Sequence, residues 1–237
     1  GASVIAASTV ANASLAKFLT SLIFPAGLAM VILNGTELFT GNSLMIIGVL
    51  DRKITFLSML RNWLIVYIGN FIGSIAVCMT MVYGHVFSLF QNAAAISAVN
   101  TAAAKCNLTF SDSFLRGILC NVLVCVAVMM AATAKSASGK IGALFLPIMV
   151  FVVCGFEHCV ANMSYITNGL LIKGITTDAE VLASMNLTNL DWYHFLVINM
   201  IPVTLGNIAG GVLTGMAYYF SHGKEATPVH SAENTIK

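Results

Sequence analysis

The chain of 237 residues is 58% hydrophobic and only 8% charged, and its mean hydropathy is +0.90. Soluble domains carry about a quarter charged residues, so this composition leaves too little polar surface for a water-soluble fold. The net charge of +2 is too small to indicate a nucleic-acid partner. The composition therefore predicts a protein whose main partner is the lipid bilayer.

Apolar residues are gathered in long runs along the chain. Five runs are long enough to cross a hydrocarbon core of about 30 Å as helices. They cover residues 18–39, 63–90, 114–134, 141–163 and 194–220. The apolar stretch 1–16 is too short for a span, and we interpret it as the second half of a first helix that is truncated in this chain. The sequence thus predicts an all-α membrane protein with six transmembrane helices in a single channel domain, 1–221, followed by a polar cytoplasmic tail, 222–237.

Lysine and arginine divide the connecting segments into two alternating sets. The richer set contains Arg52, Lys53, Arg61, Lys135, Lys140, Lys224 and Lys237, and the poorer set contains Lys17, Lys105, Arg116 and Lys173. Cytoplasmic loops of membrane proteins carry the excess of positive charge. The charge pattern therefore predicts that the richer set and the C-terminus are cytoplasmic.

A weak internal repeat relates the two halves of the chain. The pattern G-x-E-x-x-x-x-N occurs at 35–42 in the second span and again at 155–162 in the fifth. The third and sixth spans share a second pattern, G-N-x-x-G, at 69–73 and 206–210. Because three spans separate the copies, the halves must cross the membrane in opposite directions. This inverted three-helix repeat predicts a substrate path at the interface between the halves.

The repeated motif places glutamates Glu37 and Glu157 within apolar runs, where a charged side chain costs roughly 2.5–3.5 kcal/mol on insertion scales. A glycine stands two residues before each glutamate, and Pro25 and Pro147 each remove one backbone donor upstream. We therefore expect helices 2 and 5 to be broken in mid-membrane, with Glu37 and Glu157 accepting the freed N–H groups. The half-helix N-termini would direct partial positive charge at the pathway.

Three segments resemble the signature motifs of the formate/nitrite transporter family. They are 33–41 (LNGTELFTG), 117–127 (GILCNVLVCVA) and 155–163 (GFEHCVANM). The resemblance covers essentially the whole chain and implies an aquaporin-like fold, a bacterial inner-membrane location and a homopentamer with one pore per protomer. It also implies passage of formate, nitrite or hydrosulfide without a cofactor. An overall likeness to the hydrosulfide branch favours that anion, although no single residue carries the preference.

The same resemblance assigns pore positions. Its polar pore residues would be Thr40, Asn121 and His158, its apolar constrictions Phe24, Leu28, Leu38, Phe39 and Phe151, and its anion-attracting residue at the outer mouth Lys105. Without the resemblance, His158 would be an ordinary core histidine, and Asn121 would be an amide that joins two helices. Thr40 could bond its own helix, and Lys105 would be a solvated loop residue.

His158 is the residue to which the sequence gives the most chemistry. An anion between apolar constrictions loses much of its hydration, and helix ends return only part of that loss. Imidazole has an ordinary pKa of about 6.5, so His158 could pair with the anion as a cation or hand it a proton. The sequence leaves open whether protons are co-transported.

Other classes of protein are less consistent with these residues. A membrane enzyme needs a nucleophile–base pair or a complete metal site, and Cys154, His158 and Cys159 supply too few ligands for a metal. We therefore expect neither catalytic residues nor a bound metal. The alternative function is an aquaporin-like channel for small neutral solutes, but such a channel would show Asn-Pro-Ala at each break, and this sequence has Gly-x-Glu there.

Overall fold

The computed structural model describes residues 1–222, and every regular element in that range is helical. The α-helices are α1 (Ala2–Ala7), α2 (Ala13–Ile23), α3 (Pro25–Asn34), α4 (Met45–Leu50), α5 (Phe56–Tyr83), α6 (Ala93–Cys106), α7 (Phe110–Thr133), α8 (Ala137–Val153), α9 (Cys159–Ile175), α10 (Ala179–Ala183) and α11 (Met200–His222). A 3₁₀ turn, Gly41–Leu44, leads into α4, and a π-helical turn, His194–Asn199, leads into α11. The predicted tail lies outside the described residues, apart from His222, which ends α11.

Four helical segments are long and apolar enough to cross a membrane, judged by length and composition. They are Ala13–Asn34, Phe56–Tyr83, Phe110–Thr133 and His194–His222. The predicted spans agree with them in number and order except at 141–163, where α8 and α9 form two separate half-length helices. The stretch 1–16 is also divided differently, because α1 ends at Ala7 and the residues from Ala13 onward belong to α2.

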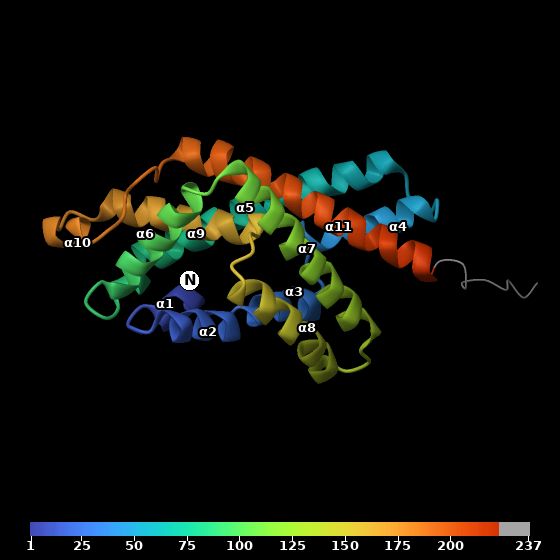
Figure 1. The fold of residues 1–237 in the computed structure, drawn as a ribbon, viewed down its shortest axis with the longest axis horizontal. Helices are drawn as coiled ribbons and strands as arrows, with labels where there is room; N and C mark the ends of the chain where they lie inside the picture. Colours follow the sequence, from blue (N-terminus) through green and yellow to red (C-terminus); the bar gives the residue numbers. More distant parts are fainter. Residues whose placement is uncertain (223–237) are drawn as a thin grey trace, which may run out of the picture.

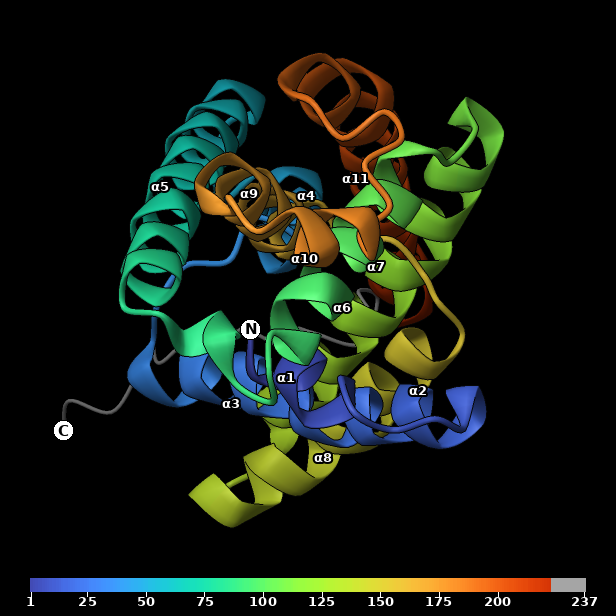
Figure 2. The ribbon, with the colours of Figure 1, turned by 90° about the vertical axis from the view of Figure 1, so that its left-hand side faces the viewer.

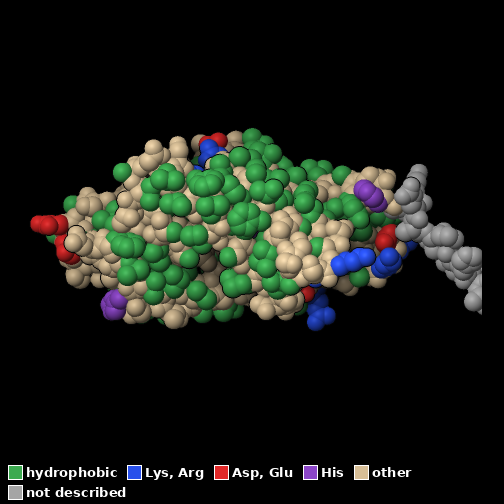
Figure 3. Space-filling view, turned by 90° about the horizontal axis from the view of Figure 1, so that it is seen from below, with side chains coloured by type: hydrophobic (Ala, Val, Ile, Leu, Met, Phe, Trp, Pro, Cys, Tyr) green, Lys and Arg blue, Asp and Glu red, His purple; other side chains and the backbone are tan. Residues whose placement is uncertain are grey.

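The long helices α5 and α11 run roughly along the long axis of the molecule (Figure 1). Seen along that axis, α2, α3 and α8 lie on one side of α6 and α7, and α5, α9 and α11 lie on the other (Figure 2). Hydrophobic side chains cover the middle of the face in Figure 3, and most charged side chains lie toward its two ends. This distribution suits a molecule whose waist is surrounded by lipid or by other subunits.

The chain leaves the helical conformation at both predicted breaks. Gly35 ends α3 with a left-handed φ of 65°, and Gly155 follows α8 with a φ of 70°. Side chains with a Cβ rarely adopt these angles, which explains why each motif begins with glycine. The glycines thus let α3 and α8 stop abruptly and turn the following loops toward each other.

Close helix packing explains the glycines in the second copy of the G-N-x-x-G pattern, 206–210, whereas a Cβ on Gly69 or Gly73 in the first copy would meet nothing within 4 Å. A Cβ on Gly206 of α11 would stand 2.2 Å from the carbonyl oxygen of Phe114 on α7, so only glycine permits this approach. A Cβ on Gly169 of α9 would likewise stand 2.3 Å from the Cβ of Ala102 on α6. The helix α6 was not predicted from the sequence, and it places Lys105 in its last turn rather than in a loop.

Candidate functional site

The two helix breaks meet at a hydrogen bond between His158 and Thr40. The Nε2 atom of His158 lies 2.8 Å from the Oγ1 atom of Thr40, and both residues are buried. Thr40 comes from the break after α3, and His158 comes from the break after α8 and forms the N-cap of α9. The structure therefore brings together two of the polar residues that the sequence singled out.

The N-cap contact fixes the tautomer of the His158 ring. Its Nδ1 atom accepts the backbone N–H of Ala161 at 3.0 Å, so Nδ1 carries no hydrogen in this geometry. A neutral imidazole then has its hydrogen on Nε2, and Nε2 must donate to the Thr40 hydroxyl. The hydroxyl hydrogen of Thr40 is consequently directed away from His158 and remains available to another acceptor.

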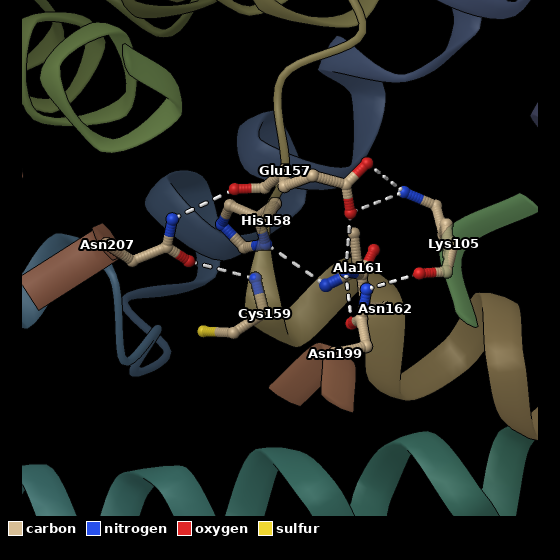
Figure 4. A network of polar contacts seen from close by, with 8 residues as sticks. All are labelled: Lys105, Glu157, His158, Cys159, Ala161, Asn162, Asn199 and Asn207. Atoms are coloured by element: carbon tan, nitrogen blue, oxygen red, sulfur yellow. Dashed lines mark hydrogen bonds and ion pairs between the residues drawn. The ribbon is translucent and has the colours of Figure 1, made fainter. Parts of the chain in front are cut away.

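An asparagine on α11 holds the second break in shape (Figure 4). The Oδ1 atom of Asn207 accepts the backbone N–H of Cys159 at 2.9 Å. Its Nδ2 atom donates to the carbonyl oxygens of Gly117 at 2.8 Å and Glu157 at 2.9 Å. One fully buried amide thus satisfies the two backbone groups at the break, the Cys159 N–H and the Glu157 carbonyl, and adds a second hydrogen bond to the Gly117 carbonyl within α7.

Asn70 on α5 holds the first break in the same way. Its Oδ1 atom accepts the backbone N–H of Phe39 at 3.0 Å, and its Nδ2 atom donates to the carbonyl oxygen of Glu37 at 3.2 Å. Asn70 and Asn207 occupy the same position in the two G-N-x-x-G patterns. The repeat therefore includes the contacts that stabilise the breaks, and not only the sequence letters.

The glutamates have partners other than the expected ones. In residues 1–222, the carboxylate of Glu157 accepts from side chains: Lys105 at 2.8 and 3.0 Å, and Asn162 at 2.7 Å. Glu37 accepts from the side chain of Asn42. The prediction that these carboxylates accept freed backbone N–H groups was wrong in this respect, because the neutral amides on α5 and α11 take that role.

Lys105 is tightly held rather than solvated. Besides its ion pair with Glu157, its ammonium group lies 5.3 Å from the centre of the Tyr165 ring. The Nδ2 atom of Asn199 donates to the carbonyl oxygen of Lys105 at 2.9 Å, and its Oδ1 atom accepts from Asn162 at 2.8 Å. The last turn of α6 is therefore connected to α9 and to the π-helical turn before α11, beside the His158 loop (Figure 4).

Asn121 lies within the protein wall and not on a cavity surface. Its Nδ2 atom is close to the carbonyl oxygens of Thr40 and Asn207, at 3.1 and 2.6 Å, and to the hydroxyl of Ser43 at 3.3 Å. The residue is fully buried, so its amide hydrogens are occupied by protein groups. Its expected place among the pore-lining groups is therefore corrected to a role in joining α7 and α11 to the first break.

Three cavities lie in series along the interface between these elements. The first, of about 480 Å³, is lined by Lys17, Lys105, Arg116, Glu157 and His158 among others. The second, of about 410 Å³, is mostly apolar and also touches His158. The third, of about 340 Å³, is lined by residues that include Asn42 and Lys140. Adjacent cavities share wall residues, which identify the partitions between them.

The partitions contain four of the five apolar residues expected at constrictions. The wall between the first and second cavities includes Phe24 and Phe151, whose rings meet edge to face with centroids 5.3 Å apart. The wall between the second and third includes Leu28 and Leu38. Phe39 points elsewhere: it packs against Trp63 and Tyr67 and lines a separate apolar groove between α5 and α11.

Several residues of the site were not identified from the sequence. Tyr165 belongs to the wall shared by the first and second cavities, and Val31 to the wall shared by the second and third. Asn70 and Asn207 were visible within the repeat, but the pattern did not reveal what their amides contact. Among residues 1–222, no three His, Cys, Asp or Glu side chains are grouped to hold a metal ion.

Comparison with known proteins agrees with this architecture. The sequence profile described as formate/nitrite transporter matches residues 1–220. The formate channel FocA of Haemophilus influenzae is 38% identical over 211 residues, which are 87% of this chain and 74% of that protein. FocA of Escherichia coli K12 is 32% identical over 216 residues, 89% of this chain and 76% of that protein.

Solved structures show the same fold. A pentameric formate channel with formate bound has a TM-score of 0.82 at 34% identity and covers 93% of this chain and 89% of its own. A structure described as an FNT family ion channel has a TM-score of 0.76 at 28% identity, covering 95% and 84%. The chain therefore belongs to the formate/nitrite transporter family.

Proposed function

We propose that this protein is a multi-pass membrane channel that conducts small monovalent anions, with formate as its first candidate substrate. The observation that carries the proposal is the series of three cavities, separated by apolar partitions, with His158 on the wall of the first two. The relatives named for formate add support for formate. They give no support to the earlier preference for hydrosulfide.

The assembly proposed is a homopentamer in a bacterial inner membrane, in which each protomer has six transmembrane segments arranged as an inverted repeat. The matched amide contacts of Asn70 and Asn207 support the repeat, and the pentameric relative supports the assembly. Positive charges at Lys135 and Lys140 support a cytoplasmic α7–α8 loop. A single cysteine introduced at Ser138 in a cysteine-free background should then react only from the cytoplasmic side.

Phe24 and Phe151 on one side, and Leu28 and Leu38 on the other, would keep water from forming a continuous column. An anion between them needs donors to replace lost hydration. The Nε2–H group of His158 already donates to Thr40, so the hydroxyl hydrogen of Thr40 would be the neutral donor that this pair offers to an anion.

The tautomer restricts how His158 could take part in proton transfer. A second proton would have to bind Nδ1, where it would meet the backbone N–H of Ala161 and break the N-cap contact. A charged His158 therefore requires a local change at the start of α9. Proton-coupled transport would therefore require the N-cap contact at Nδ1 to open. It would also require a proton to exchange between Nε2 and the Thr40 hydroxyl.

A flux assay tests the proposed function. Purified protein in proteoliposomes should take up formate and nitrite faster than protein-free vesicles, and should leave glycerol permeability unchanged. Uptake measured with and without a pH gradient separates passive conduction from proton-coupled transport. Glycerol conduction without formate uptake would contradict the proposal and favour a channel for neutral solutes.

A further inference from the structure

The first cavity has an excess of positive charge near the His158 loop. Its lining includes the cations Lys17, Lys105 and Arg116, whereas Glu157 is the one carboxylate among its lining residues. A cavity with low-dielectric walls and charges of one sign concentrates ions of the opposite sign. The question is which of these cations is available to a mobile anion.

Lys105 is the least available of the three. Its ammonium group contacts both carboxylate oxygens of Glu157, at 2.8 and 3.0 Å, and the side chains are only 15% and 6% exposed. The pair is locally neutral, and separating it would leave a buried charge without a partner. Lys105 therefore has little charge left for a passing anion, although the family resemblance points to this lysine.

Arg116 is partly compensated. Its guanidinium group lies 3.8 Å from the carboxylate of Asp112, one turn earlier on α7. Both side chains are close to half-exposed, so water screens this contact and its energy is small. The backbone of Arg116 has a different role, because its carbonyl oxygen accepts the N–H of Glu157 at 3.3 Å.

Lys17 has no ion-pair partner within the described range. It lies on α2, and its Nζ atom is 3.9 Å from the point where a Cβ on Gly155 would stand. Its charge is therefore placed directly over the break that carries Glu157 and His158. A glycine at this position leaves the approach to the ammonium group free of a side chain.

We propose that Lys17, assisted by Arg116, forms an anion-recruiting site in the first cavity that delivers small monovalent anions to the His158 partition. The paired Lys105 serves chiefly to neutralise Glu157. The proposal rests on the proposed function in one respect, since the recruited anion is taken to be the conducted one. The charge at Lys17 itself can be tested without any transport measurement.

The first test uses Cys154, which is exposed, directly precedes Gly155, and is the one exposed cysteine in residues 1–222. Its rates of reaction with an anionic and a cationic methanethiosulfonate reagent report the local potential. The Lys17→Met variant should lower the anionic-to-cationic rate ratio several-fold at low ionic strength, and Lys17→Arg should restore it. Lys53→Met, which removes an exposed lysine paired with Asp51, is the matched control and should leave the ratio unchanged.

The second test measures initial formate uptake in proteoliposomes at sub-saturating formate. Lys17→Met should reduce uptake by up to roughly tenfold at low ionic strength and much less at high salt, where the charge is screened. Lys17→Arg should retain the wild-type salt dependence. At saturating formate, the uptake rates of Lys17→Met and of the wild type should become more similar, because recruitment limits the uptake rate only when anions are scarce.

The outcomes separate the two proposals. Wild-type vesicles that take up no formate would contradict the proposed function, while a changed thiol rate ratio would still support the charge at Lys17. Normal wild-type uptake with unchanged rate ratio and salt dependence in Lys17→Met would overturn the recruiting site alone. If Lys105→Met produced the salt effect instead, the free cation would be Lys105.

Discussion

The two helix breaks share their backbone geometry but differ in whether their glutamate belongs to an ion pair. In both, a left-handed glycine ends a helix, and an asparagine of the neighbouring long helix pairs with the loop backbone. In both, a second asparagine side chain joins the glutamate to a third asparagine, through Asn42 and Asn62 in the first and Asn162 and Asn199 in the second. The shape of each break is thus maintained by neutral amides.

The difference is that only the second break has a buried ion pair. Glu157 is 4% exposed and bound to Lys105, whereas Glu37 is exposed in the protomer and makes no ion pair within residues 1–222. The lesson is that the fold of a break and its electrostatics are separable. The half with the buried ion pair is also the half that carries His158.

The largest effect should come from removing the buried asparagine brace. Asn207→Ala leaves two buried backbone groups, the Cys159 N–H and the Glu157 carbonyl, without partners at about 1–3 kcal/mol each, and it also removes the second bond to the Gly117 carbonyl. Asn70→Ala affects two groups in a less buried place and should cost less. Thermal unfolding of the detergent-solubilised oligomer should therefore show a larger loss for Asn207→Ala. Equal losses would indicate that burial does not distinguish the two breaks.

Breaking the ion pair should rank next. Lys105→Met leaves Glu157 buried without its counter-ion, at a cost of up to about 3–5 kcal/mol. Adding Glu157→Gln in the same protein removes that unpaired charge and should recover much of the stability. A double variant as unstable as the sum of the two single variants would show that the pair is not energetically coupled.

The two glutamates should respond differently to the same conservative change. Glu157→Gln removes one of two oxygens that accept from Lys105 and Asn162, so it should lower stability measurably. Glu37→Gln changes an exposed side chain and should cost less than about 1 kcal/mol. Similar losses in thermal unfolding would suggest that Glu37 is covered in the assembled protein.

The smallest effect concerns a group outside the breaks and outside the membrane spans. The N–H of His194 and then its ring lower the pKa of the Asp191 carboxyl below its usual value of 3.8. The ionised Asp191 carboxylate therefore stabilises the folded protein at pH values above 3.8, and this contribution is lost as the pH falls through the lower pKa of the folded state. Asp191→Asn should remove this acid-dependent part of stability and leave the flux profile between pH 5 and 8, a range chosen around the ordinary imidazole pKa, unchanged.

Much of the path could be predicted from the sequence because local motifs define it. Glycine at a left-handed position, the repeated G-x-E pattern and the apolar runs identify the breaks and the long helices. The family motifs also identified Phe24, Leu28, Leu38, Phe151 and His158, which line the cavities.

The rest depends on the direction in which side chains point. A motif gives the position of Asn121 on α7 and of Phe39 beside Leu38, but not the direction of either side chain, and both point away from the three cavities. The partner of Glu157 comes from α6, an alanine-rich helix whose buried face gives only a weak hydropathy signal. Contacts between residues so distant in sequence require the three-dimensional structure.

The most direct test of the proposed mechanism is the pH profile of formate flux in the His158→Asn variant. Asparagine is a favourable N-cap residue and can accept the Ala161 N–H in place of Nδ1, so the fold should be retained while titration is lost. The matched control is His222→Asn at the exposed end of α11. We predict a folded oligomer whose flux has lost most of its pH dependence, and a wild-type profile in this variant would contradict the role assigned to His158.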